Sequence, residues 1–170
     1  MQKMIIIGSP GTGKSTLAKK LADSLIIKLY HLDKLFWKPQ WKMSTKEEQR
    51  EILYDIVKQN SWIIDGNYSS TLDIRIKEAD TIIYLKRSRM TCLYHVFKRF
   101  ISYRGKTRPD MQENCPEKLD REFIRWVWQF SKNHEPLIEE YLKDLTSEQT
   151  LIKLTNSKEI DDFLNSLESM

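Results

Sequence analysis

Residues 8 to 16 read GSPGTGKST, and their types and spacing suit the binding of a nucleotide phosphate. The segment fits the pattern Gly-x-x-x-x-Gly-Lys-Ser between an apolar run and a helix-forming stretch, as a Walker A loop requires. Glycines let consecutive backbone N–H groups turn inward, which makes a nest for phosphate oxygens at a helix N-terminus. The residues expected to bind the nucleotide are Gly8, Ser9, Pro10, Gly11, Thr12, Gly13, Lys14, Ser15 and Thr16.

Two residues of this loop would have distinct roles toward a nucleoside triphosphate. Lys14 would reach the β- and γ-phosphates, and the Ser15 hydroxyl would ligate Mg²⁺. A chance Lys-Ser after a glycine-rich turn is the alternative, and it is weak because the chain has only five glycines. A dinucleotide-binding fingerprint also fits poorly, because KSTL follows GTG where a third glycine is needed.

Two aspartates are candidates for a second metal ligand, which phosphoryl transfer needs at the end of a neighbouring strand. Asp65 is the better candidate, because it ends the apolar run WIID and is followed by Gly66, which allows close approach. Its alternative role is an Asx-turn that closes the strand. Asp33 would hold either a water on the metal or a hydroxyl of the acceptor, and the sequence leaves both roles open.

A long basic segment lies between Asp80 and Asp110, where no acidic residue occurs. Its basic residues are Lys86, Arg87, Arg89, Lys98, Arg99, Arg104, Lys106 and Arg108. Arginines stabilise the charge on a transferring phosphoryl group, so the catalytic candidates are Arg99, Arg104, Arg108 and Arg125, although arginines also commonly solvate a helix face. Gly105 and two prolines interrupt the helical pattern, which predicts a closing lid at about residues 104–120.

Aromatic residues follow Asp33 as Phe36, Trp37 and Trp41, and they could form an acceptor pocket with a face for a base or ring. Core packing is at least an equal alternative for these side chains. The three histidines are scattered, so neither a metal site nor a histidine base is indicated. Two cysteines are too few for a disulfide framework or a four-thiolate zinc site.

Apolar runs predict five short strands, at residues 4–8, 25–33, 62–66, 81–85 and 150–154. Helices are expected at about 14–25, 44–60, 88–103, from 116 with a break at Pro136, and after 156, with Ser44 and Glu47 capping the second. This alternation predicts one α/β domain over residues 1–170, with a parallel sheet covered on both faces. Ligands bind beyond the carboxyl ends of such strands, where the phosphate loop, Asp33, Asp65 and Asn156 would meet.

Bulk composition fits one globular domain of 170 residues, with 40% hydrophobic residues, 31% charged residues and a net charge of +4. No apolar run approaches the length of a membrane span, and the N-terminal run is too short for a signal peptide. We therefore expect a cytoplasmic monomer that does not associate with membranes.

With these residues in place, the chain resembles the adenylate-kinase-like P-loop kinases, a group that includes nucleotide, shikimate and gluconate kinases. More closely, it resembles the adenylate-kinase-related proteins called DNA topology modulation proteins, through GSPGTGKST, HLDKLFW, WIIDGNY, RGKTRPD and CPEKLDREFIRWVW. The resemblance covers most of the chain. It implies a P-loop NTPase fold of three α/β/α layers with a helical lid, ATP·Mg²⁺ as phosphoryl donor, and an adenine contact near residues 155–157, including Asn156.

The chain departs from adenylate kinases where those enzymes grip the acceptor phosphate. Residues 65–69 read DGNYS where adenylate kinases have Asp-Gly-Phe-Pro-Arg, and residues 30–36 keep the aspartate of Thr-Gly-Asp-x-Leu-Arg without its arginine. Arg50 or Arg75 would have to replace the missing arginine. Binding of AMP in the adenylate-kinase manner is therefore in doubt.

The favoured hypothesis is an ATP-dependent kinase that moves the γ-phosphate to an unidentified small-molecule or nucleotide acceptor. The predicted lid favours it, because exclusion of water matters most to an enzyme that transfers a phosphoryl group instead of hydrolysing ATP. The alternative is a nucleotide-dependent regulatory or nucleic-acid-binding protein with weak ATPase activity, which would use the basic segment on DNA or RNA. No helix-turn-helix or zinc-finger pattern accompanies that segment.

Overall fold

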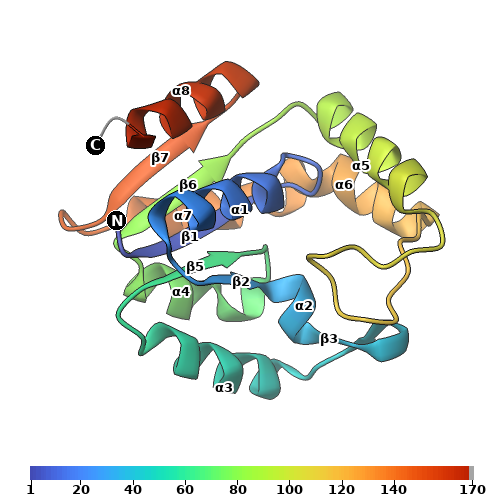
Figure 1. The fold of residues 1–170 in the computed structure, drawn as a ribbon, viewed down its shortest axis with the longest axis horizontal. Helices are drawn as coiled ribbons and strands as arrows, with labels where there is room; N and C mark the ends of the chain where they lie inside the picture. Colours follow the sequence, from blue (N-terminus) through green and yellow to red (C-terminus); the bar gives the residue numbers. More distant parts are fainter. Residues whose placement is uncertain (169–170) are drawn as a thin grey trace.

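The computed structural model describes residues 1–168 and shows a five-stranded sheet flanked by helices (Figure 1). The strand order is β2-β5-β1-β6-β7, and every pairing between these strands is parallel. In this order the strands are Leu29–His31, Trp62–Asp65, Lys3–Gly8, Thr81–Leu85 and Thr150–Leu154. The predicted α/β fold class, with a five-stranded parallel sheet, is confirmed.

Eight α-helices connect and cover these strands within the described residues. They are α1 Lys14–Leu25, α2 Leu32–Phe36, α3 Lys46–Val57, α4 Leu72–Glu78, α5 Arg89–Tyr103, α6 Arg121–Asn133, α7 Glu135–Lys143 and α8 Ser157–Glu168. Short 3₁₀ turns lie at Pro39–Trp41 and Ser69–Thr71. No helix in this part of the chain is both long enough and apolar enough to cross a membrane.

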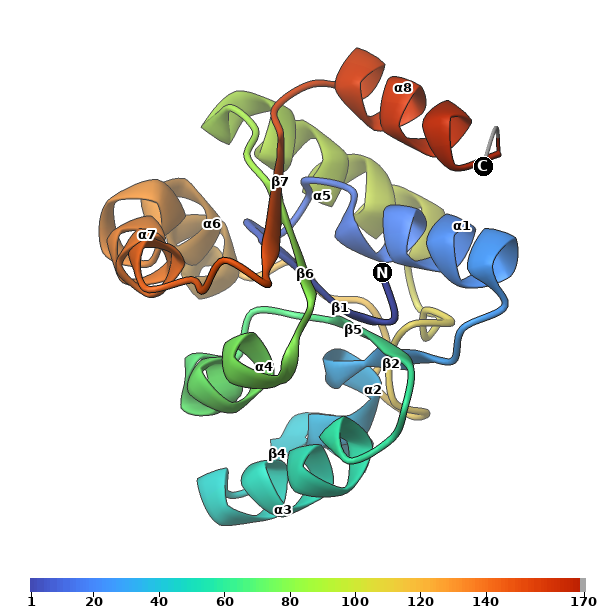
Figure 2. The same ribbon diagram turned by 90° about the vertical axis from the view of Figure 1, so that its left-hand side faces the viewer.

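The central strand β1 is buried on both faces, because its side chains alternate between two hydrophobic cores. Met4 and Ile6 pack with residues of α1 and α8, whereas Ile5 and Ile7 pack with residues of α3, α4, α6 and α7. Figure 2 shows the resulting layers, with α1 and α8 on one side of the sheet and α4 and α7 on the other. The fold is therefore a three-layer α/β/α arrangement.

Several predicted boundaries differ from the structure. The second strand is short and ends at His31, so Asp33 lies in the first turn of α2 instead of ending a strand. The predicted cap pair of Ser44 and Glu47 is wrong by one residue, because Ser44 is buried and donates its hydroxyl to the Phe36 carbonyl. Thr45 and Glu48 form the capping box of α3 instead.

The loop between α5 and α6 extends further than predicted. The sequence pattern predicted that the next helix begins at about residue 116, but α6 begins at Arg121. The Asp120 side chain caps this helix by accepting a hydrogen bond from the Phe123 backbone N–H at 2.7 Å. The predicted break at Pro136 is confirmed, because α6 ends at Asn133 and α7 begins with Pro136 in its first turn.

The loop over residues 104–120 packs against a small antiparallel hairpin formed by β3 Trp37–Lys38 and β4 Lys42–Met43. The Gln40 backbone N–H donates to the Asn114 carbonyl at 3.2 Å, and the Cys115 thiol lies 3.4 Å from the Lys38 carbonyl. Both contacts join segments more than 70 residues apart in sequence. They place this loop beside the carboxyl ends of the strands.

Candidate active site

The phosphate loop joins β1 to α1, and its glycines have conformations that other residues rarely adopt. Gly8 has φ 141° and pairs with Leu85 of β6, whose carbonyl oxygen would lie 2.1 Å from an added Cβ. Gly11 has φ 81°, and an added Cβ would lie 2.3 Å from the Cys92 carbonyl oxygen. A side chain is therefore excluded at both positions by sterics as well as by backbone conformation.

Three side chains stabilise this loop: Thr12 belongs to the loop, and His95 and Asn67 come from other segments. The hydroxyl of Thr12 donates to the Ser9 carbonyl at 2.8 Å, and His95 of α5 contacts the Gly11 carbonyl through Nδ1 at 2.7 Å. Asn67 accepts a hydrogen bond from the Gly8 N–H at 3.0 Å and donates to the Gly8 carbonyl. Sequence reasoning missed His95 and Asn67, because neither belongs to the Walker A pattern.

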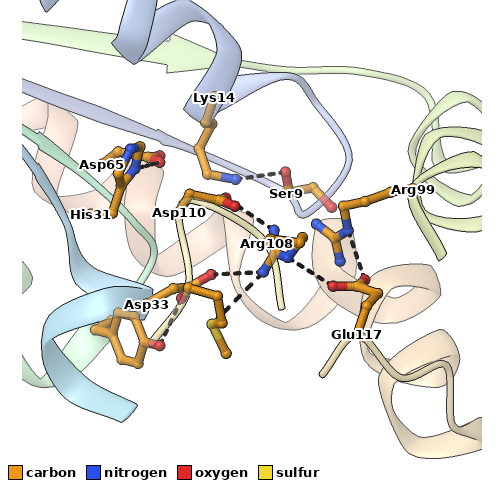
Figure 3. A network of polar contacts seen from close by, with 11 residues as sticks. Ser9, Lys14, His31, Asp33, Asp65, Arg99, Arg108, Asp110 and Glu117 are labelled. Atoms are coloured by element: carbon orange, nitrogen blue, oxygen red, sulfur yellow. Dashed lines mark hydrogen bonds and ion pairs between the residues drawn. The ribbon is translucent and has the colours of Figure 1, made fainter. Parts of the chain in front are cut away.

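Lys14 lies at the start of α1, where its ammonium group donates to the Ser9 carbonyl at 2.9 Å. Burial lowers the pKa of this lysine, while the negative charges of Asp65 and Asp33 act in the opposite direction. The structure thus brings Lys14 near both predicted aspartates, although Asp33 and Asp65 follow different strands. Figure 3 shows the three side chains around one site.

Asp65 ends β5 and is buried, with only 4% of its surface exposed. His31 is its direct neighbour in the β2–β5 register, and the His31 Nδ1 lies 3.0 Å from Asp65 Oδ2. The other oxygen, Oδ1, is buried without a hydrogen-bond partner among the described residues. A buried carboxylate oxygen left without a partner needs a ligand to compensate its desolvation.

The donor set at this site fits Mg²⁺. This ion takes oxygen ligands, keeps several waters, and is held by one or two carboxylates together with substrate phosphates. Asp65 Oδ1 offers a free carboxylate oxygen, and Ser15 lies in the first turn of α1 beside Lys14. Residues 1–168 contain no group of three or more His, Cys, Asp or Glu that could hold a metal ion.

Asp33 projects from α2 toward the loop over residues 104–120 (Figure 3). Its Oδ1 accepts a hydrogen bond from the Tyr68 hydroxyl at 2.7 Å, and its Oδ2 lies 3.6 Å from Arg108 Nη2. Burial raises the pKa of Tyr68, and the charge of Asp33 raises it further. Asp33 remains 42% exposed at its side chain, so a ligand can still reach it.

Two of the predicted arginines form a buried cluster with acidic residues of the loop (Figure 3). Glu117 binds both, with Arg99 Nε at 2.8 Å and Arg108 Nε at 2.7 Å. Arg108 also pairs with Asp110 at 3.0 Å. Burial lowers the pKa of Arg99, and the charge of Arg108 lowers it further, while Glu117 opposes the shift. No sequence motif indicated Glu117, because its partners Arg99 and Arg108 lie 18 and 9 residues earlier, on α5 and at another position in the loop.

The structure does not bring all the candidates into this cluster. Arg104 and Arg125 are exposed, and no ion pair joins either to another described residue. Asn156 lies before α8, where its side chain accepts from the Glu159 N–H at 2.9 Å and so caps that helix. The catalytic roles of Arg104 and Arg125, and the adenine contact of Asn156, stay predictions.

The predicted aromatic pocket divides into two parts. Phe36 is fully buried and packs edge-on against Tyr68, with ring centroids 4.8 Å apart, so it is a core residue and no pocket wall. Trp37 and Trp41 are half-buried in the hairpin, with centroids 5.3 Å apart. Lys118 of the loop lies over the Trp41 ring at 4.8 Å, which places these rings beside the loop.

Neither arginine suggested as a replacement for the missing phosphate-binding arginine is free. Arg75 is fully buried and donates to the carbonyls of Gly66, Tyr68 and Thr71 at 2.7–3.3 Å. Arg50 pairs with both carboxylate oxygens of Asp73, at 3.1 and 3.0 Å, and donates to the Ser70 carbonyl. Both therefore hold the segment that follows β5.

A phosphate loop between the first strand and first helix of a parallel five-stranded sheet defines a P-loop NTPase. The chain belongs to the ATPase family associated with various cellular activities (AAA). The sequence model of this family matches residues 4–108, which is more than half of the chain. No curated protein matches the chain.

Solved structures of kinases share this fold. Shikimate kinase from Acinetobacter baumannii in complex with shikimate superposes with a TM-score of 0.62 at 15% identity, covering 99% of this chain and 92% of that one. A gluconokinase from Sinorhizobium meliloti 1021 gives 0.52 at 13% identity, covering 99% and 90%. A putative kinase from Chloroflexus aurantiacus gives 0.54 at 15%, covering 99% and 97%. At these identities the likeness establishes the fold alone.

Proposed function

We propose that this protein is an ATP-dependent phosphotransferase that moves the γ-phosphate of ATP to a hydroxyl group of a small acceptor. One observation carries the proposal: the loop over residues 104–120 directs Arg108 to Asp33, on the side of the site that faces Lys14. A loop in this place would exclude water and hold the Arg108 guanidinium, together with its acidic partners, beside the position where a phosphoryl group would transfer. We infer that this loop is a lid within a single domain of residues 1–170.

In this reaction the acceptor oxygen forms a bond to the γ-phosphorus while the bond between that phosphorus and the β,γ-bridging oxygen breaks. ADP leaves with the electron pair of the broken bond. Asp33 would accept a hydrogen bond from the attacking hydroxyl and receive or pass on its proton. Lys14 and the N–H groups of the loop would hold the phosphates, and Arg99 and Arg108 would face the transferring group.

A Mg²⁺ held at this site would supply positive charge against the negative charge of the phosphates. Asp65 and Ser15 are the residues we assign to it, with His31 holding the Asp65 carboxylate in one orientation. This assignment leaves Asp33 to the acceptor, since its side chain is 42% exposed and its two oxygens contact Tyr68 and Arg108. Carboxylates on two neighbouring segments thus have different roles.

A nucleic-acid-binding function, as in the DNA topology modulation proteins, is the second candidate, and the basic segment gives it less support. Within this segment Lys86 pairs with Glu135 and Glu139, and the charges of Arg99 and Arg108 meet Glu117. The exposed side chains of α5 include large apolar ones, namely Met90, Tyr94, Phe97 and Ile101. These apolar side chains lie among the exposed cations Arg89, Lys98, Arg104 and Lys106, which are the ones left to contact a phosphate backbone.

Two variants test the proposed function by ATP binding and by transfer of labelled phosphate. Lys14→Ala should weaken ATP binding at least about tenfold, as expected for the loss of one charged contact of about 1.4 kcal/mol or more. Lys19→Ala, on the exposed part of the same helix, is its control. Unchanged ATP affinity in Lys14→Ala would remove the phosphate loop from the site.

Asp65→Asn should lower Mg²⁺-dependent transfer by roughly a hundredfold while changing ATP affinity much less, because the carboxylate acts through the metal. Asp55→Asn is the matched control, since Asp55 is exposed on α3. Equal turnover of Asp65→Asn and the unmodified protein would show that Asp65 does not hold the metal.

A further inference from the structure

The charges around Asp33 restrict the chemistry of the acceptor. The charged side chains labelled in this part of the site in Figure 3, apart from His31, are Lys14 from α1, Arg99 from α5, Arg108, Asp110 and Glu117 from the loop, Asp33 from α2 and Asp65 from β5. Three cations thus face four carboxylates. The phosphates of ATP would add further negative charge, of which the Mg²⁺ assigned to Asp65 and Ser15 would neutralise a part.

The buried cations of this cluster already have acidic partners. Arg108 is 8% exposed and contacts three carboxylates, those of Glu117 at 2.7 Å, Asp110 at 3.0 Å and Asp33 at 3.6 Å. Arg99 binds the same Glu117. An acceptor phosphate or carboxylate would have to compete with these fixed partners, and its charge would lie beside theirs.

The neighbouring segments offer no substitute. The guanidinium groups of Arg50 and Arg75 are held by Asp73 and by backbone carbonyls. The other cations of α2, the hairpin and the loop are exposed, and they contribute little to binding an anion because water solvates them: Lys34, Lys38, Lys42, Arg104, Lys106 and Lys118. A buried anion left without a cationic partner would be strongly disfavoured.

We propose that the acceptor is a hydroxylated compound that carries no phosphate or carboxylate group, such as a polyol, a sugar, a nucleoside or an aminated sugar. This inference rests on the proposed phosphotransferase function. A hydroxyl donates a hydrogen bond to Asp33 without adding charge, and an ammonium group would be attracted by Asp33 and Asp110. Trp37 and Trp41 offer apolar faces for the ring of such a compound.

The test separates small molecules by charge before the reaction. A small-molecule cell extract is passed over an anion-exchange resin, which gives an unbound neutral and cationic fraction and a bound anionic fraction. Each fraction is incubated with the full-length protein, Mg²⁺ and γ-labelled ATP, and transferred label is separated from free phosphate. We expect labelled products from the unbound fraction at least about tenfold above those from the anionic fraction.

Three outcomes are possible for the unmodified protein. Label transferred mainly to the unbound fraction supports the inference. Label transferred mainly to the anionic fraction overturns it, while the proposed phosphotransferase function stands. Transfer to neither fraction overturns both.

A variant of the loop tests the reason given for this preference. Asp110→Asn removes one of the carboxylates that neutralise Arg108, so the ratio of anionic to neutral acceptors should rise by roughly fivefold or more, as expected for one charge at close range. Glu113→Gln, an exposed acid of the same loop, is the control and should leave the ratio unchanged. An unchanged ratio in Asp110→Asn would overturn the electrostatic argument, because a merely structural effect would lower both activities together.

Discussion

The Glu117 carboxylate should hold the loop over residues 104–120 in its place, and Glu117→Gln tests this. The side chain of Glu117 is 3% exposed, and it binds the guanidinium groups of Arg99 and Arg108 at 2.8 and 2.7 Å. Because these two arginines come from α5 and from the loop, the carboxylate connects the loop to the helix. Its removal should therefore open the loop locally and leave the sheet intact.

The loss of free energy that holds the loop closed follows from the interactions that Glu117→Gln keeps. Removing one partner of a buried ion pair costs about 3–5 kcal/mol. Arg108 keeps Asp110, Arg99 is 25% exposed, and glutamine keeps one oxygen that accepts a hydrogen bond, so about 2 kcal/mol is a reasonable reduced value. An opening equilibrium should then rise by about thirtyfold, since 1.4 kcal/mol is a factor of about ten.

Amide hydrogen exchange measures this opening directly. The backbone N–H of Met111 donates to the Arg108 carbonyl within the loop, and that of Gln40 donates to the Asn114 carbonyl across to the hairpin. Both amides should exchange about thirtyfold faster in Glu117→Gln, whereas amides of β1 should not change. Glu113→Gln is the control. Unchanged exchange at both loop reporters, or equal acceleration in β1, would refute the role given to Glu117.

Two further substitutions separate structural roles from functional ones. Arg75→Met should lower the free energy of unfolding by about 2–4 kcal/mol in a denaturant titration, because it leaves the carbonyls of the segment after β5 without a buried donor. Normal stability together with a raised KM for the acceptor would instead assign Arg75 to substrate binding. Tyr84→Phe removes a buried hydroxyl that has no hydrogen-bond partner among the described residues, so stability near neutral pH should stay the same or rise by about 1 kcal/mol. Burial raises the pKa of Tyr84 from 10.0 to about 12, so the folded protein keeps a proton that the unfolded chain loses. Stability of the unmodified protein should therefore fall as pH rises from 10 to about 12, and less steeply in Tyr84→Phe, whereas parallel pH profiles would show that Tyr84 does not contribute.

The sequence by itself determined the features that depend on consecutive residues. The phosphate loop was predictable because its glycines, Lys14 and Ser15 act through local backbone geometry at a helix N-terminus. The five strands were predictable from apolar runs, because a parallel sheet buried on both faces requires them. Their parallel arrangement followed from the intervening helices.

Local patterns failed where a tertiary contact competed with them. Ser44 matches a helix cap as well as Thr45 does, yet its hydroxyl binds the Phe36 carbonyl, and the capping box moves by one residue. Asp33 followed an apolar run that ended sooner than its pattern indicated, so it lies on α2. Phe36 belongs to the core, although it stands beside two tryptophans that do not.

Only the tertiary structure decided which charged groups meet. The strand register sets His31 beside Asp65, and the packing of the loop on the hairpin directs Arg108 to Asp33. Glu117 neutralises arginines that the sequence offered as free positive charge. These pairings are between residues distant along the chain, and the energy of each depends on burial that no local pattern encodes. The groups proposed to bind the nucleotide phosphates therefore come from one short segment of the sequence. The groups proposed to contact the acceptor are brought together only by the fold.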